Sequence, residues 1–305
     1  MVVLGALAGY LLFGAAGALG AGAVLVNLFT PLPAAVLGMR LGPPWGVAAV
    51  GLTIVAVLVT SGVVPALLYQ VQFGLPAMLI PWLLLRGVSW DRTVFTTLGL
   101  TMALGVIVLI GAVSGSGQSP VGFVNEQVDR EIEQTVTMMS EFAGAEQSPA
   151  DAEAFRQMVA GMGDLMRRAY PAMLVVVCGA LQLVTVGLLA FVSRPIGLPG
   201  PPLARWRSPE LLIWALIAAG FVVALGTGGV HTVAINVLII LLPLYFLQGV
   251  AVVEHFLAGK GLSPLLRGAS YLFLLVVSPL PAIVTGLGVF DLWADFRKPR
   301  PSKDS

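Results

Sequence analysis

The sequence is poor in charged residues and contains only one cysteine and two histidines. The lone Cys178 excludes a disulfide framework and a cysteine-based metal cluster, and two histidines exclude a multi-histidine metal site. A net charge of +1 excludes the basic footprint of a nucleic-acid-binding protein. The P-loop, zinc-protease, serine-hydrolase and EF-hand motifs are missing as well. We therefore expect no enzymatic activity, no bound metal, no cofactor and no nucleic-acid partner.

Charge is absent over long stretches of the chain. Six runs contain no Asp, Glu, Lys or Arg, namely 1–39, 41–85, 93–125, 169–193, 211–253 and 268–290. A helix needs about 20 apolar residues to cross the hydrocarbon core of a bilayer, so each run is long enough for one crossing. The hydrophobic fraction of 58% and the mean hydropathy of +0.96 agree. The sequence predicts an all-α protein, a polytopic bundle of transmembrane helices.

Glycine and proline predict where the longest runs turn. Pro31 and Pro33 cannot both lie inside a helix without loss of its hydrogen bonds, so we expect a break at 27–33 and a short helix after it. Other turns are expected at 42–44, 61–65 and 226–229. The predicted spans number eight or nine, depending on how 28–40 is counted. They include 45–61, 65–86, 93–113, 169–193, 267–291 and two within 211–253. No basic segment precedes the first apolar stretch, so we expect no cleaved signal peptide.

One long polar segment, 114–168, interrupts the apolar runs and carries a net charge of −5. Within it, Val124, Val128 and Ile132 begin one apolar stripe at helical spacing, and Phe155 begins another after a cap at Ser148. We expect two amphipathic helices outside the bilayer, at 120–143 and 148–168. They could form a hairpin, cover the membrane domain or bind a partner. Their acidic faces argue against binding to the lipid surface.

These features divide the chain into four parts. They are a transmembrane part (1–113), the acidic segment (114–168), a second transmembrane part (169–296) and a basic tail (297–305). Lysine and arginine divide evenly between the two sides of the membrane, so the positive-inside rule does not decide the orientation. The basic tail favours a C-terminus at the anionic cytoplasmic leaflet. We expect a multi-pass protein of the bacterial cytoplasmic (inner) membrane.

Polar side chains within the spans are the candidates for a binding site, because polar groups are costly at membrane depth. As ligand-binding candidates we select Asn27, Tyr69, Gln70, His231, Asn236 and Gln248. Buried amides also serve as hydrogen-bonding glue between helices, and this alternative stays open. Gln182, Glu254 and His255 are further polar residues in or near the spans, and the last two fit a position at headgroup level.

The first helix is rich in small residues. Gly5 and Gly9, and Gly14 and Ala18, are pairs with three residues between them. Such pairs let a second helix approach closely, so the first helix is a candidate docking face for a membrane-protein partner.

Three segments, taken in order, resemble the YybS-like family of bacterial membrane proteins of unknown function. They read PLPAAVLGMRLG at 31–42, LYFLQGVAVV at 244–253 and GLGVFDLWADFRK at 286–298. That family is similar to the substrate-binding S components of energy-coupling-factor vitamin transporters and, more distantly, to MreD-type proteins. The resemblance implies an S-component-like bundle in the N-terminal part with a docking face on its first helix. It names no ligand.

Two functions follow from the sequence. The first is a small-molecule-binding or transport subunit without an energy-coupling site of its own, whose cavity is reached near 27–33. The second is a non-transporting scaffold that recruits a partner through 114–168 or the first helix. Both would act within the lipid bilayer.

Overall fold

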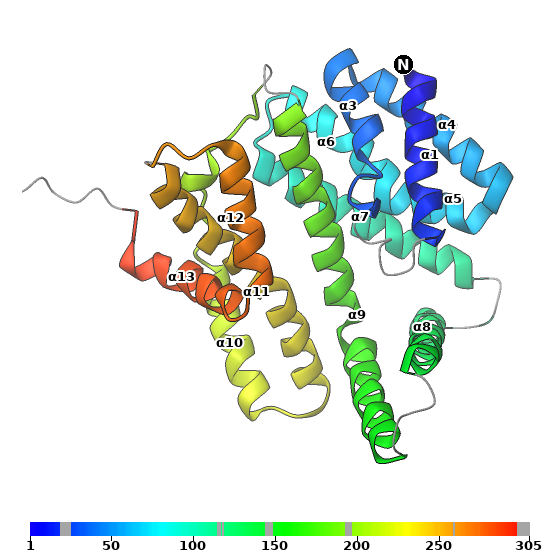
Figure 1. Ribbon diagram of the computed structural model, residues 1–305, viewed down its shortest axis with the longest axis vertical. Coiled ribbons are helices and arrows are strands. Elements are labelled where there is room, and N and C mark those ends of the chain that lie inside the picture. Colours follow the sequence, from blue (N-terminus) through cyan, green and yellow to red (C-terminus); the bar gives the residue numbers. More distant parts are fainter. Residues whose placement is uncertain are drawn as a thin grey trace, which may run out of the picture. The chain divides into compact units, whose positions relative to one another are not determined.

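The computed structural model describes residues 1–18, 26–114, 117, 119–143, 149–192, 197–258 and 260–297. Within these ranges the regular structure is helical and no strand occurs, which confirms the all-α prediction (Figure 1). The chain forms two compact units. Unit 1 comprises Met1–Arg167 and Val177–Gly200, and unit 2 comprises Arg168–Val176 and Pro201–Ser305. The sequence predicted a boundary between the acidic segment and the second transmembrane part at 168/169. This position lies inside the helix Pro149–Val192.

Unit 1 contains most of the N-terminal helices. They are α1 (Val2–Ala18), α3 (Leu32–Leu41), α4 (Pro43–Ser61), α5 (Val63–Tyr69), the π-helical turn η2 (Gln70–Gly74), α6 (Leu75–Leu85), α7 (Trp90–Val113) and α8 (Pro120–Ala143). The expected break at 27–33 appears as a turn, in which Phe29, Thr30 and Leu32 each donate to a carbonyl three residues back. Residues 19–25 of the predicted first span lie outside the described residues.

Small residues allow the helices of unit 1 to pack closely. A Cβ atom on Gly46 of α4 would lie 3.0 Å from the carbonyl oxygen of Ala34 in α3 and 3.0 Å from Cα of Gly38. A larger side chain at Gly46 would therefore push α3 and α4 apart. Such close backbone contact is the usual way in which membrane helices gain packing energy, because lipid supplies no hydrophobic drive between them.

Helix α9 (Pro149–Val192) is one element of 44 residues. It joins the two elements that the sequence predicted separately, the amphipathic helix 148–168 and the span 169–193. The change in composition at 168 marks a change of surroundings rather than the end of a helix. The part Gly163–Val192 is apolar and long enough to cross a membrane.

Unit 2 contains the 3₁₀ turn η4 (Leu203–Arg205), α10 (Leu212–Leu225), α11 (Gly228–Ala258), α12 (Pro264–Val276) and α13 (Leu280–Ala294). The turn expected at 226–229 separates α10 from α11. The single span predicted at 267–291 is not one continuous helix, because α12 and α13 bend by 103° at their junction. Pro279 and Pro281 lie at this bend, where proline removes a donor and disfavours helix in the preceding residue.

The described residues contain fewer helices of membrane-crossing length than the sequence predicted. Among the described residues, five helices are long and apolar enough: Pro43–Ser61, Val63–Leu85, Trp90–Val113, Gly163–Val192 and Gly228–Ala258. The bent pair α12–α13 would raise the number to 6. Val2–Ala15, Leu32–Leu41 and Leu212–Leu225 are apolar but shorter. Eight or nine spans are therefore not confirmed, because an apolar run of sufficient length need not form one sufficiently long helix.

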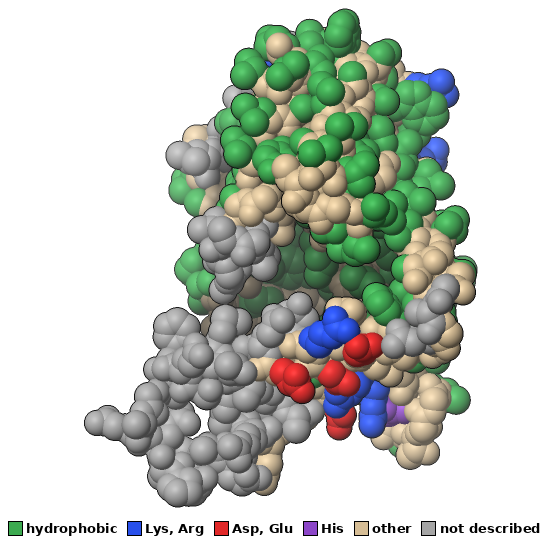
Figure 2. All heavy atoms as spheres, turned by 90° about the vertical axis from the view of Figure 1, so that its right-hand side faces the viewer, with side chains coloured by type: hydrophobic (Ala, Val, Ile, Leu, Met, Phe, Trp, Pro, Cys, Tyr) green, Lys and Arg blue, Asp and Glu red, His purple; other side chains and the backbone are tan. Residues whose placement is uncertain are grey.

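The acidic side chains visible on one face lie close together. Figure 2 shows them in its lower part beside several Lys and Arg side chains, with a few further Lys and Arg at the upper right edge and apolar side chains over much of the remaining face. In α8 and α9 the exposed charges pair with one another, Glu126 with Arg130, and Asp129 and Asp164 with Arg167. Such exposed ion pairs are compatible with water and not with lipid tails, as expected for a helical segment outside the bilayer.

Candidate functional site

Helices α11 and α13 cross with their backbones in contact at two glycines. A Cβ atom on Gly249 would lie 1.8 Å from the carbonyl oxygen of Val284, and one on Gly288 would lie 1.9 Å from that of Tyr245. No larger residue fits at either position without displacing a helix. This approach brings Gln248, next to Gly249, within reach of Asp291, one turn after Gly288.

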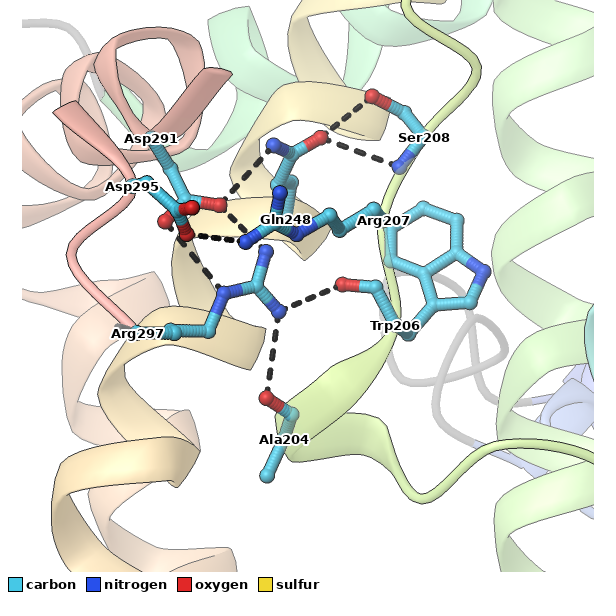
Figure 3. Close-up of polar contacts among 8 residues, drawn as sticks. All are labelled: Ala204, Trp206, Arg207, Ser208, Gln248, Asp291, Asp295 and Arg297. Carbon is cyan, nitrogen blue, oxygen red and sulfur yellow. Dashed lines mark hydrogen bonds and ion pairs between the residues drawn. The ribbon is translucent and has the colours of Figure 1, made fainter. Parts of the chain in front are cut away.

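Gln248 and Asp291 form the centre of a buried polar network (Figure 3). Both are fully buried, with 0% exposure. Gln248 Nε2 donates to Asp291 Oδ2 at 3.4 Å. Gln248 Oε1 accepts from the backbone N–H of Ser208 at 3.2 Å and also from the Ser208 hydroxyl. Both ends of the Gln248 amide are thus bonded to the protein itself.

Arg297 neutralises the buried carboxylate. Its Nε donates to Asp291 Oδ1 at 3.4 Å, and its Nη2 pairs with Oδ2. Its Nη1 donates to the carbonyl oxygens of Trp206 at 2.8 Å and Ala204 at 3.2 Å. Arg297 thereby binds the Asp291 carboxylate through two nitrogens, which is the bidentate geometry that the planar guanidinium favours. A second pair, Arg207 with Asp295, lies beside it (Figure 3).

The network joins three segments of unit 2: residues 203–208 before α10, the later part of α11, and the end of α13. A charge buried at this depth is strongly destabilising unless it is paired and hydrogen-bonded, and both charges here are. These hydrogen bonds occupy the Asp291 carboxylate, the Gln248 amide and most of the Arg297 guanidinium. The arrangement therefore holds these three segments together by paired polar groups and leaves little hydrogen-bonding capacity for a ligand at Gln248.

Asn236 of α11 bonds to a proline-containing turn of α9. Its Oδ1 accepts from the backbone N–H of Ala172 at 3.1 Å, and its Nδ2 donates to the carbonyl oxygen of Arg168 at 2.7 Å. These two backbone groups are partners in a regular helix, and Pro171 lies between them. The Asn236 amide bridges backbone groups at the site that proline disturbs. Of the two interpretations offered by the sequence, this geometry favours helix packing.

The remaining candidates in unit 2 and in the turn before α3 lie in different surroundings. His231 is half-buried near the start of α11. Glu254, near the end of α11, accepts from Arg267 at 3.0 Å and from the Tyr271 hydroxyl. Asn27 accepts from Thr30 Oγ1 at 3.5 Å within the turn. No group of three His, Cys, Asp or Glu residues that could hold a metal ion occurs among the described residues.

Tyr69 and Gln70 lie at the junction of α5 and η2 in unit 1. The Tyr69 ring is buried and packs edge-on against Phe13, with ring centroids 5.4 Å apart. Gln70 Oε1 is buried and has no hydrogen-bond partner within the described part of the chain. A Cβ atom on Gly74 would lie only 2.4 Å from this oxygen, so the glycine provides the space that the amide occupies.

The small residues of α1 have three kinds of surroundings. A Cβ on Gly5 would lie 2.4 Å from Leu37 of α3, and one on Gly9 would lie 3.4 Å from Thr53 of α4. These two glycines therefore pack against helices of the same chain. Nothing lies within 4 Å of the Cβ position of Gly14. The surroundings of the Ala18 side chain lie outside the described residues.

Sequence reasoning missed a second buried polar group in unit 1. Thr97 and Thr101 of α7 and Gln182 of α9 are fully buried. Gln182 Nε2 donates to Thr101 Oγ1 at 3.2 Å, whereas no described residue bonds to Gln182 Oε1 or Thr97 Oγ1. Gln182 is recognisable in the sequence as an amide within a span. A threonine within an apolar helix gives no comparable signal.

Ser208, Asp291 and Arg297 were also missed as site residues. The two charged residues follow the last apolar run and lie in the segment 286–298, which resembles the YybS-like family. The sequence does not show that these residues lie close to the amide of Gln248 in α11.

A family model described as "Predicted membrane protein (DUF2232)" matches residues 8–292. The match extends from α1 to Asp291 of the network and so covers nearly the whole chain. The comparisons with curated proteins and with solved structures give no match. The similarity to YybS-like proteins, S components and MreD-type proteins therefore stays a prediction. The protein is an integral membrane protein with several apolar helices, and it belongs to the DUF2232 family of predicted membrane proteins.

Proposed function

We propose that this protein is a non-enzymatic, membrane-embedded subunit that binds a small molecule in unit 1, at Gln70. The observation that carries the proposal is the buried Oε1 of Gln70, which has no hydrogen-bond partner among the residues that the structure describes. An amide oxygen at membrane depth raises the free energy of the folded state unless it accepts a hydrogen bond. A ligand with an N–H or O–H donor would supply that bond.

The local backbone supports this position. Gln70 begins a π-helical turn inside the helical stretch Val63–Leu85, and π turns within α-helices are frequent at functional sites. Gly74 accommodates the Gln70 amide, because a Cβ atom at that position would lie 2.4 Å from the amide oxygen, and Tyr69 directly precedes Gln70 in the chain. Gln248 was expected to line the same cavity. We do not include Gln248 in the proposed ligand site, because its amide is bonded to Ser208 and Asp291.

A transport role would need an external source of energy. The sequence has no nucleotide-binding motif, so active transport would depend on a partner subunit, as in the S components that the sequence resembles. In α1, the open position beside Gly14 supports the partner contact better than Gly5 and Gly9, which pack within unit 1.

Native mass spectrometry tests the proposal on the full chain purified in lipid nanodiscs. We expect a small molecule to co-purify with the wild type and with the control Gln72→Leu, and to be lost from Gln70→Leu. Gln72 lies on the same π-helical turn two residues after Gln70, so its side chain leaves the helix on roughly the opposite side. The proposal fails if no molecule co-purifies and Gln70→Leu raises the melting temperature, because the oxygen would then simply be unpaired.

A scaffold function is the second candidate, and the exposed charges of α8 and α9 favour it. Glu126, Asp129 and Asp164 are exposed and give this segment an acidic surface outside the spans. Cross-linking in native membranes, with the mass of the complex as readout, distinguishes the two functions. Under a scaffold function, Glu126→Gln together with Asp129→Asn releases a partner and Gln70→Leu does not.

A further inference from the structure

We infer a second ligand site in unit 1, between α7 and α9, formed by Thr97, Thr101 and Gln182. The site would hold a small neutral group that both donates and accepts hydrogen bonds. It goes beyond the proposed function, because it uses other helices and does not include Gln70.

The three side chains converge from two helices. Thr97 and Thr101 are four residues apart on α7 and so lie on the same face, one turn from each other. Gln182 extends from α9 and donates to Thr101 Oγ1 at 3.2 Å. All three have 0% exposure. The bond between Gln182 and Thr101 therefore places the amide within about one helical turn of the Thr97 hydroxyl.

Two hydrogen-bonding atoms of this group are left without a partner. They are Gln182 Oε1 and Thr97 Oγ1. Other threonines in the spans bond to a carbonyl of their own helix, for example Thr185 to that of Leu181 at 2.8 Å and Thr60 to that of Ala56 at 2.8 Å. Buried polar atoms are almost always paired, and an unpaired one calls for an unseen water or ligand. Two such atoms, one on each of two adjacent helices, point to one shared guest.

The chemistry of the guest follows from the donors and acceptors. Gln182 Oε1 needs a donor, and the Thr97 hydroxyl can either donate or accept. If the amide is rotated by 180°, Gln182 Nε2 needs an acceptor instead. A group that both donates and accepts fits either orientation. Water, an alcohol and a primary amide have this property.

The guest is expected to be neutral. From Thr93 to Val113 in α7, and from Ala169 to Val192 in α9, the sequence has no Asp, Glu, Lys or Arg. An ion between α7 and α9 would therefore have no compensating charge from either helix. An uncompensated ion at membrane depth is strongly disfavoured.

Thr97→Val tests the site, because valine keeps the shape of threonine and removes only the hydroxyl. The full chain in nanodiscs is melted with and without added glycerol or acetamide. If the hydroxyl holds a guest, the variant melts lower than the wild type by about 2–4 °C. If the hydroxyl is simply unpaired, the variant melts higher, which overturns the inference. Thr60→Val is the matched control, since Thr60 is exposed and bonded to its own helix.

Nuclear Overhauser contacts from labelled threonine methyl groups identify the guest. A contact between the Thr97 methyl and water shows that the guest is water. A contact to glycerol or acetamide, with a rise in melting temperature that Thr97→Val loses, shows a small polar solute. The absence of both contacts, with a raised melting temperature for Thr97→Val, refutes the site. Gln70→Leu should leave the Thr97 contacts unchanged, so this site and the proposed function can fail independently.

Discussion

Asp291 and Arg297, six positions apart in the chain, form a buried ion pair. The chain reverses between them at Asp295, which ends α13 in the left-handed conformation with φ of 42°. Aspartate adopts this conformation more readily than most residues, because its short side chain can bond locally. The reversal returns Arg297 to the carboxylate and lets it contact the 203–208 segment as well.

Removing one partner of this pair should be strongly destabilising. Asp291→Leu leaves the Arg297 guanidinium buried without its counter-charge, and we expect the free energy of unfolding to fall by about 3–5 kcal/mol. Denaturant unfolding in detergent micelles measures this. Glu126→Gln, which breaks an exposed pair, should change stability by only about 0–1 kcal/mol. The double variant Asp291→Leu with Arg297→Met should be more stable than Asp291→Leu alone. Equal losses from Asp291→Leu and Glu126→Gln would contradict the buried pair.

The crossing of α11 and α13 should depend on Gly288. Gly288→Ala places a methyl group against the carbonyl oxygen of Tyr245, so we expect a loss of about 1–3 kcal/mol or more. Gly286→Ala is the matched control on the same helix, because nothing lies within 4 Å of its Cβ position. That control should be neutral or gain up to about 1 kcal/mol from its better helix propensity. Thermal unfolding compares the two variants, and a Gly288→Ala protein as stable as the control would rule out the close crossing.

Asn236 and Pro171 should be energetically coupled. Asn236→Leu leaves the N–H of Ala172 and the carbonyl of Arg168 without the bridging amide, and we expect a loss of about 1–3 kcal/mol. In a Pro171→Ala background a regular helical ladder can form, so the same substitution should be less damaging. A double-mutant cycle by thermal unfolding measures the coupling. A coupling energy of zero would show that the two residues act independently.

The α8–α9 contact should depend on Ile132. A Cβ atom on Gly163 of α9 would lie only 2.7 Å from Cδ1 of Ile132 in α8. Helix α8 therefore packs closely on the first half of α9. Ile132→Asp introduces a charge at this contact and should speed hydrogen exchange in α8. Val121→Asp is the control, since Val121 is 59% exposed. Equal exchange rates in α8 for the two variants would argue against a packed α8.

Local backbone chemistry was readable from the sequence where proline or glycine occurs in pairs. Pro31 with Pro33, and the glycines at 226–229, correctly predicted breaks. Pro279 and Pro281 have the same spacing as the first pair, and the bend between α12 and α13 lies there. That bend was therefore predictable and was missed. The continuity of α9 was harder to predict, because the charge pattern changes at 168 while the backbone continues as a helix.

The sequence alone determined that this is a helical, multi-pass membrane protein with breaks at specific residues. Both properties depend on short stretches of chain: hydrocarbon selects apolar runs, and proline removes a backbone donor wherever it lies. Tertiary structure decided the role of each polar side chain. Gln248 and Asn236 are paired by groups 43 and 64 residues away, whereas Gln70 and Gln182 keep an unpaired oxygen. Four amides of the same kind differ only in what the neighbouring helix places beside them, and no local pattern encodes that.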